Sequence, residues 1–163
     1  MKRKIAICVM CMIALVLLFT LPYPQKINIE YDGIANSGSP VEEIIPVHIE
    51  MKGTLKNYLI KEDVYEGKFS ISLLPYTEAS SCKVSASVKN NVVSHLMYLC
   101  EDGYQVPGYF VPIEGFNTLY IRIISEDNKE YEIYAPAADS SDADEIRKAA
   151  QEYLSWPLPN LSN

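Results

Sequence analysis

The amino-acid sequence predicts a mainly β fold, either an antiparallel sandwich or a partly closed barrel of about seven strands, with a helix at each end. Three observations predict it. They are an uncharged apolar run near the N-terminus, a central series of segments that alternate apolar and polar residues, and a helical apolar stripe near the C-terminus. These features divide the chain into a transmembrane signal anchor at 1–25, a β domain at 26–137, and a C-terminal amphipathic helix and tail at 138–163.

The N-terminal run, residues 5–21, contains 17 residues without a charge and follows Lys2, Arg3 and Lys4. As a helix it would be roughly 26 Å long, near the short limit for spanning a bilayer core of about 30 Å. The positive-inside rule places the basic start in the cytoplasm and the rest of the chain outside the cell membrane. No A-x-A-like cleavage site follows the run, so an uncleaved single-pass anchor is favoured over a cleaved signal.

The charge of the chain argues against a nucleic-acid-binding protein. The 163 residues include 14 basic and 21 acidic side chains, and three of the basic ones lie within residues 1–4. Residues 5–163 therefore carry 11 basic and 21 acidic side chains, a net charge of −10. A nucleic-acid-binding protein needs a basic surface. The expected partners are instead the membrane, through residues 5–21, and a protein of the cell envelope.

Alternation of apolar and polar residues predicts the first strands at residues 27–31, 47–51 and 65–73. Between the first two, the segment GIANSGSP at residues 33–40 is rich in glycine and serine and is interpreted as a linker or loop. The alternation places every second side chain on one buried face, as is typical of antiparallel strands.

A first hairpin is predicted around Asn91. In this register Val84 lies opposite Tyr98 and Cys82 lies opposite Cys100, and all four side chains point toward the core. Outside the cytoplasm the two cysteines can form a disulfide, which would contribute roughly 3 kcal/mol for a loop of this length. The alternative is a pair of buried free thiols that behave as small apolar side chains.

A second hairpin is predicted around Asp127. It places Ile121 opposite Ile133 and Ile123 opposite Tyr131 on an aliphatic inner face. The two pairs give one consistent register for this hairpin.

The other face of the second hairpin agrees with that register. Arg122 lies opposite Glu132, which is a pair of opposite charges, and Tyr120 lies opposite Tyr134. Asn128 is expected to supply a left-handed turn residue.

The C-terminal segment SSDADEIRKAAQEYLSWP predicts an amphipathic helix. Ser141 and Asp144 have the spacing of a capping box. One stripe of apolar residues is expected to pack on the sheet or near the membrane; its members are Ala143, Ile146, Ala150, Tyr153 and Leu154.

No motif of catalytic or metal-binding chemistry is found, so no enzyme activity, cofactor or metal site is predicted. The two histidines, His48 and His95, lie on different predicted strands and lack the spacing of a zinc site. The sequence contains no phosphate-binding loop, nucleophile elbow or dinucleotide fingerprint.

The run YQVPGYFVPIEGF offers a candidate contact patch made of Tyr104, Tyr109, Phe110 and Phe116. Aromatic side chains on a fixed loop are good contact residues. The dipeptide Pro107–Gly108 within the run is interpreted as a turn. The alternative is a pair of strands that covers the core.

The stretch VHIEMKGTLKNYLIKEDVYEGKFSI, residues 47–71, resembles a pattern in small single-pass, membrane-anchored extracytoplasmic proteins of clostridial-type Firmicutes. The basic anchor before it and the tyrosine-rich strands after it agree with that pattern. The resemblance implies the location and layout of the chain, and it assigns no activity and no functional residues.

These observations predict a membrane-anchored extracytoplasmic module that binds a ligand or takes part in an envelope assembly. One alternative is a secreted soluble factor released by signal cleavage. The other is an enzyme or inhibitor whose site has no recognisable motif. An exposed aromatic patch would favour binding, whereas converging titratable groups in a pocket would favour an enzyme.

Overall fold

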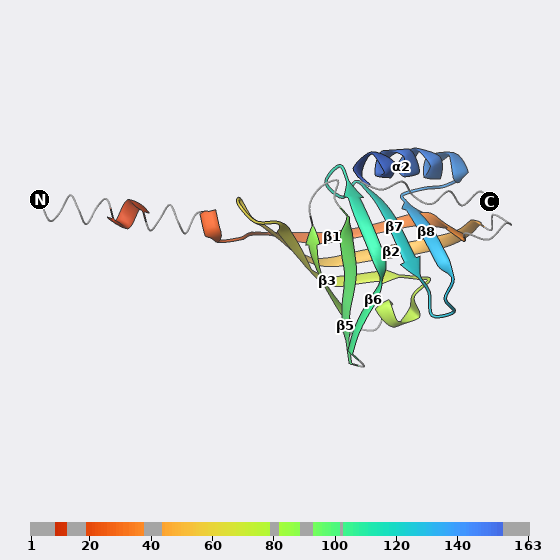
Figure 1. Ribbon diagram of the computed structural model, residues 1–163, viewed down its shortest axis with the longest axis horizontal. Coiled ribbons are helices and arrows are strands. Elements are labelled where there is room, and N and C mark those ends of the chain that lie inside the picture. The colour runs from red at the N-terminus through yellow and green to blue at the C-terminus, as the bar shows by residue number, and fades with distance from the viewer. Residues whose placement is uncertain are drawn as a thin grey trace, which may run out of the picture.

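The protein is mainly β, with a closed antiparallel barrel of eight strands and one short C-terminal helix (Figure 1). The computed structural model describes residues 9–12, 19–37, 44–78, 82–88, 93–101 and 103–154. The strands follow one another around the wall in chain order: β1 (Tyr23–Ser37), β2 (Ile44–Asn57), β3 (Asp63–Ile71), β4 (Lys83–Val88), β5 (Ser94–Cys100), β6 (Gly103–Ile113), β7 (Thr118–Ile124) and β8 (Glu130–Ala135). A 3₁₀ helix, η1 (Pro75–Glu78), joins β3 to β4, and α2 (Ser140–Tyr153) follows β8.

Closure of the barrel corrects the sandwich and the partly closed barrel expected from the sequence. The first strand reaches Ser37 and pairs with β8, with Ala35 opposite Ile133. Residues 33–37 therefore belong to a strand and not to the predicted linker, while residues 38–40 lie outside the described part. Gly33 permits this approach, since a Cβ there would lie 2.4 Å from the carbonyl oxygen of Tyr134.

Both predicted hairpin registers are confirmed where the strands pair. Val84 lies opposite Tyr98 in the first hairpin, and Ile121 lies opposite Ile133 in the second. The turn of the second hairpin has Asn128 at φ 60°, the left-handed conformation expected for it.

The predicted turn at Pro107–Gly108 is wrong, because both residues lie inside β6. A Cβ on Gly108 would lie 1.9 Å from the carbonyl oxygen of Arg122 on β7. Glycine is therefore needed here for the close approach of a neighbouring strand.

The barrel interior is packed with large side chains. The fully buried ones include Tyr65, Tyr98, Phe69, Phe110, Ile49, Met51, Ile71, Leu96 and Ile121. Burial of such side chains stabilises the fold by about 1.5–3 kcal/mol each. At one end, the turn after β6 brings Phe116 into this core, and Tyr31 donates a hydrogen bond to its carbonyl oxygen. Burial raises the pKa of Tyr31 to about 12, so its hydroxyl stays a donor.

Helix α2 lies on the outside of the barrel, against β6, β7 and β8 (Figure 1). Most of the predicted stripe is buried there, including Ile146 and Ala150. The predicted capping box is wrong. Asp139 is the N-cap, and its carboxylate accepts hydrogen bonds from the backbone N–H groups of Ser141 and Asp142.

In the predicted anchor, residues 9–12 and 19–20 are helical, while residues 5–8 and 13–18 lie outside the described part. Among the described residues, none of the helices has both the length and the apolar character needed to cross a bilayer.

Candidate functional site

Strands β5 and β6 extend beyond β7 as an arm, defined here as residues 96–100 and 103–107 (Figure 1). On its other side, the arm pairs with the start of β4 at Tyr98 and Leu99. Gly103 and Tyr104 pair with Cys100 and Leu99 on β5. Strand β7 pairs with β6 only from Gly108 onward. The arm therefore has one strand edge that β7 does not cover.

The inner face of the arm is fixed to the barrel. Tyr98 is fully buried, and its hydroxyl donates a hydrogen bond of 2.8 Å to the carbonyl oxygen of Phe69. Its ring meets the ring of Tyr76 edge-on, with centroids 5.8 Å apart. Burial raises the pKa of Tyr98 well above its ordinary value, so the hydroxyl remains a donor. A disulfide between Cys82 and Cys100, with Cα atoms 4.3 Å apart, joins the arm to the start of β4.

The outer face of the arm exposes large apolar side chains. The exposed fractions are 43% for Met97, 51% for Leu99, 70% for Tyr104, 60% for Val106 and 54% for Ile124 on β7 beside it. We call these five residues the arm patch. Single exposed apolar residues are common on soluble proteins, but a group on adjacent strands is typical of an interaction surface.

The edge of β6 adds backbone groups to this surface. In the described part of the chain, no strand pairs with residues 103–107 on the side that β7 occupies farther along. Every second residue of an antiparallel strand directs its N–H and C=O groups toward the same edge. The arm can therefore offer both apolar side chains and main-chain hydrogen-bonding groups to a partner.

The structure separates the four residues of the predicted contact patch. Tyr104 belongs to the arm patch, whereas Tyr109 is half-buried on the face beneath α2. Phe110 is fully buried, with its ring centroid 5.4 Å from that of Phe69, and Phe116 is buried at the barrel end. The two phenylalanines are thus core residues. Strand alternation turns Phe110 inward when Tyr109 faces outward, and the turn after β6 carries Phe116 into the core.

Sequence reasoning missed three residues of the arm patch on β5 and β6: Met97, Leu99 and Val106. A signal was present in SHLMYLC, where apolar residues occupy both faces of the strand. Leu96 and Tyr98 point inward, and Met97 and Leu99 point outward.

A second cluster lies beneath α2, around the buried carboxylate of Glu132. It accepts hydrogen bonds from the hydroxyls of Tyr120 at 3.0 Å and Tyr134 at 2.6 Å. Arg147 of α2 brings its Nε within 3.9 Å of the same carboxylate. Burial raises the pKa values of Tyr120 and Tyr134, and the neighbouring Glu132 raises them further. The two hydroxyls therefore stay protonated donors, and the cluster lies beneath α2, which packs on this face through Ala143, Ile146 and Ala150.

A small pocket opens at the barrel end that Phe116 closes. Its volume is about 210 Å³, below the 300 Å³ or more that is usual for small-molecule sites. Two of its polar residues are already hydrogen-bonded: Asn57 donates to the carbonyl oxygen of Tyr23, and Asp63 accepts from the backbone N–H of Tyr58.

The histidines lie apart, on different strands. His48 on β2 places its Nδ1 2.9 Å from an Asp32 carboxylate oxygen, and His95 is exposed on β5. Within the described ranges, no three histidine, cysteine, aspartate or glutamate residues come together as a metal site.

Comparison with known proteins gives no match to this chain, whether among protein-family models, curated proteins or solved structures. Its function is therefore inferred from its own surfaces. Among the described residues, the arm patch groups the largest number of exposed apolar side chains on adjacent strands.

Proposed function

We propose that the protein is a membrane-anchored extracytoplasmic module that binds a protein of the cell envelope through the arm patch. One observation carries the proposal: the arm patch exposes five large apolar side chains, four of them on the arm and one on β7, while the inner face of the arm is fixed by Tyr98 and by the disulfide. Fixed apolar groups lose little conformational entropy on binding. The uncharged run at residues 5–21, with its basic start, supports the anchored location.

The chemistry of the arm defines the partner. The uncovered edge of β6 fits an extended segment that adds a strand, and the arm patch fits alternate apolar side chains on that segment. Residues 5–163 have a net charge of −10, so electrostatics favour a partner with neutral or basic residues around the segment and disfavour a second copy of this chain.

Photo-crosslinking in intact cells tests the proposal. A photoreactive phenylalanine analogue replaces Tyr104 in the full chain, and the matched control carries it at the exposed Glu145 on α2. We expect crosslinks from position 104 to fall within one short segment of one envelope protein, and position 145 not to reach that segment. Val106→Asp, placed in the same strand, should abolish the crosslink because it puts a charge into the apolar contact.

Three results would contradict the proposal. They are crosslinks scattered over many proteins, equal crosslinking from both positions, and crosslinking unchanged by Val106→Asp. A full-length chain absent from the membrane fraction, with a shorter chain in the medium, would favour the released factor instead.

A further inference from the structure

The turn between β2 and β3 also exposes apolar side chains. Leu59 is 57% exposed and its neighbour Ile60 is 72% exposed. We call residues 58–61 the hairpin tip. Two adjacent aliphatic residues at the end of a projecting turn have no packing role within the barrel, so they suggest contact with something outside it.

The hairpin tip lies where the chain leaves the N-terminal apolar run. Strand β1 begins at Tyr23, directly opposite Asn57, the last residue of β2 before the tip. Figure 1 shows the β2–β3 turn reaching toward residues 19–20. Leu21 and Tyr23 beside it are 55% and 47% exposed. The apolar surface of the tip is therefore continuous with the segment expected in the membrane.

The other residues of the tip fit the headgroup region of a bilayer. Lys61 places its Nζ 5.1 Å from the centroid of the Tyr58 ring. Tyrosine and lysine both favour this region, where an apolar body lies inward and a polar end stays in water.

The two carboxylates that follow the tip are held by other groups. Asp63 accepts a hydrogen bond from the backbone N–H of Tyr58, and Glu62 accepts one from the hydroxyl of Ser87 on β4. These bonds direct the acidic groups back to the barrel, so Leu59 and Ile60 form the leading surface of the turn.

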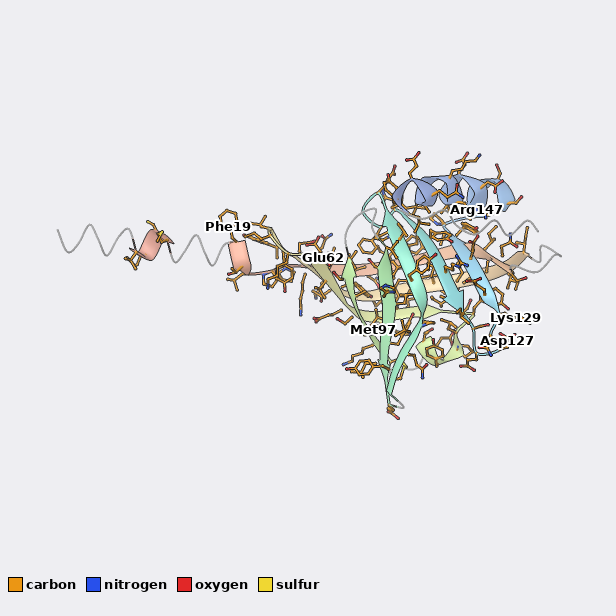
Figure 2. All side chains as sticks on the ribbon, viewed as in Figure 1. Phe19, Glu62, Met97, Asp127, Lys129 and Arg147 are labelled. Atoms are coloured by element: carbon orange, nitrogen blue, oxygen red, sulfur yellow. A yellow bond between two sulfur atoms is a disulfide. The ribbon has the colours of Figure 1, made fainter. Side chains whose placement is uncertain are left out.

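We propose that the hairpin tip inserts Leu59 and Ile60 into the outer surface of the phospholipid bilayer, beside the anchor. The inference rests on the anchored location in the proposed function. Interfacial apolar segments penetrate about 5–10 Å into the headgroup and acyl boundary. The anchor and the hairpin tip together attach the barrel at two points and so fix its orientation relative to the membrane. Figure 2 shows Met97 on the arm farther than Glu62 from Phe19, so Met97 is expected to stay outside the lipid when the tip inserts.

Depth-dependent quenching of tryptophan fluorescence tests this contact. The full chain has a single tryptophan, Trp156. In a Trp156→Phe background, Ile60→Trp reports on the tip and Met97→Trp is the control on the arm. Both are reconstituted into phosphatidylcholine vesicles whose acyl chains carry bromine at defined depths. Leu59→Trp serves as a second reporter, and circular dichroism checks that each variant keeps its β structure.

We expect brominated lipid to quench Ile60→Trp and Leu59→Trp, most strongly when bromine lies near the headgroups, and to leave Met97→Trp unchanged. Unquenched tip reporters in vesicles that carry the protein, or equal quenching at Met97, would overturn the inference. Flotation of the vesicles tests the anchor separately. Failure of the chain to float would overturn the proposed location, whereas a chain that floats with unquenched tip reporters overturns the tip contact alone.

Discussion

The outer faces of two hairpins in the same barrel differ in what they present to solvent. On β2 and β3, Glu50 accepts hydrogen bonds from Lys52 and from Lys68, the latter at 3.1 Å. On β5 and β6, the arm patch places apolar side chains at the equivalent outward positions. Strand alternation alone would allow polar residues at the outward positions of both hairpins, as on most solvated sheets. The outer face of β2 and β3 thus pairs its charged side chains with one another, whereas the arm patch leaves apolar side chains exposed.

The outer face beneath α2 is covered by this helix. There the apolar positions pack under the helix, and the buried Glu132 is hydrogen-bonded by Tyr120 and Tyr134. In the part of the chain that the structure describes, no helix covers the apolar residues of the arm patch.

The largest difference in the free energy of unfolding should be between a substitution in the core and one in the arm patch. Phe110→Ala should lower the free energy of unfolding by about 4 kcal/mol, because it leaves a cavity next to Phe69. Tyr104→Ala, at an exposed position, should change it by less than about 0.5 kcal/mol. Urea unfolding of the full chain in mild detergent, followed by circular dichroism, measures both. Equal losses would contradict the placement of these two aromatic residues.

The disulfide should stabilise the arm by restricting the unfolded chain. Replacing both Cys82 and Cys100 by alanine should cost about 3 kcal/mol, the value expected for cysteines 18 residues apart. Cys11→Ala, at a free cysteine, is the control and should have no effect on the barrel. A reducing agent should lower the free energy of unfolding of the wild type to that of the double variant, as measured by the same urea titration. A wild type insensitive to reduction would contradict the bond.

The free energy of unfolding should depend on the buried carboxylate of Glu132, on the face beneath α2. Glu132→Leu leaves the hydroxyls of Tyr120 and Tyr134 without their acceptor, at a cost of about 1 kcal/mol or more each, so a loss of about 2 kcal/mol is expected. Glu130→Leu, a half-exposed glutamate on the same strand, should cost less than about 1 kcal/mol. Urea unfolding compares them, and a cost no larger at Glu132 than at Glu130 would show that the hydrogen bonds to Glu132 do not stabilise the fold.

The smallest effect is expected on the charged outer face of β2 and β3. There Glu50 should make the free energy of unfolding fall at acid pH. Hydrogen bonds from Lys52 and then Lys68 lower the pKa of Glu50 from 4.5 to about 2. Because the folded pKa is the lower one, this contribution is complete above pH 4.5 and is lost as the pH falls toward about 2. Both lysines are partly exposed, so solvent screening keeps it small.

Glu50→Gln should therefore flatten this part of the profile of unfolding free energy against pH. Glu145→Gln on the exposed side of α2 is the control. If the profile of Glu50→Gln follows that of the wild type between pH 4.5 and about 2, the ionic hydrogen bonds of Glu50 do not contribute.

Local pairing was predictable from the sequence, whereas closure of the barrel was not. Alternation fixes which residues face each other across a short turn, so the pairs of Val84 with Tyr98 and Ile121 with Ile133 followed from it. The pairing of Ala35 with Ile133 joins distant parts of the chain, and no local pattern predicts it.

Glycine was the residue most easily misread. Gly33 and Gly108 were interpreted as parts of a loop and a turn, yet both lie in strands where a neighbouring backbone approaches closely. The candidate site was predictable only at Tyr104. The exposed side chains of Met97 and Leu99 depend on the arm extending past β7, which is a property of strand lengths in the closed barrel.

The most direct test of the arm patch as a contact surface is the rate at which a membrane-impermeant maleimide labels Tyr104→Cys in intact cells and in the purified full chain. Glu145→Cys, exposed on α2, is the matched control. A bound partner should slow labelling at position 104 in cells relative to the purified chain, while position 145 should label at the same rate in both. Equal rates at position 104 would show that the arm patch is uncovered, and no labelling at position 145 in cells would show that the barrel is not outside the membrane.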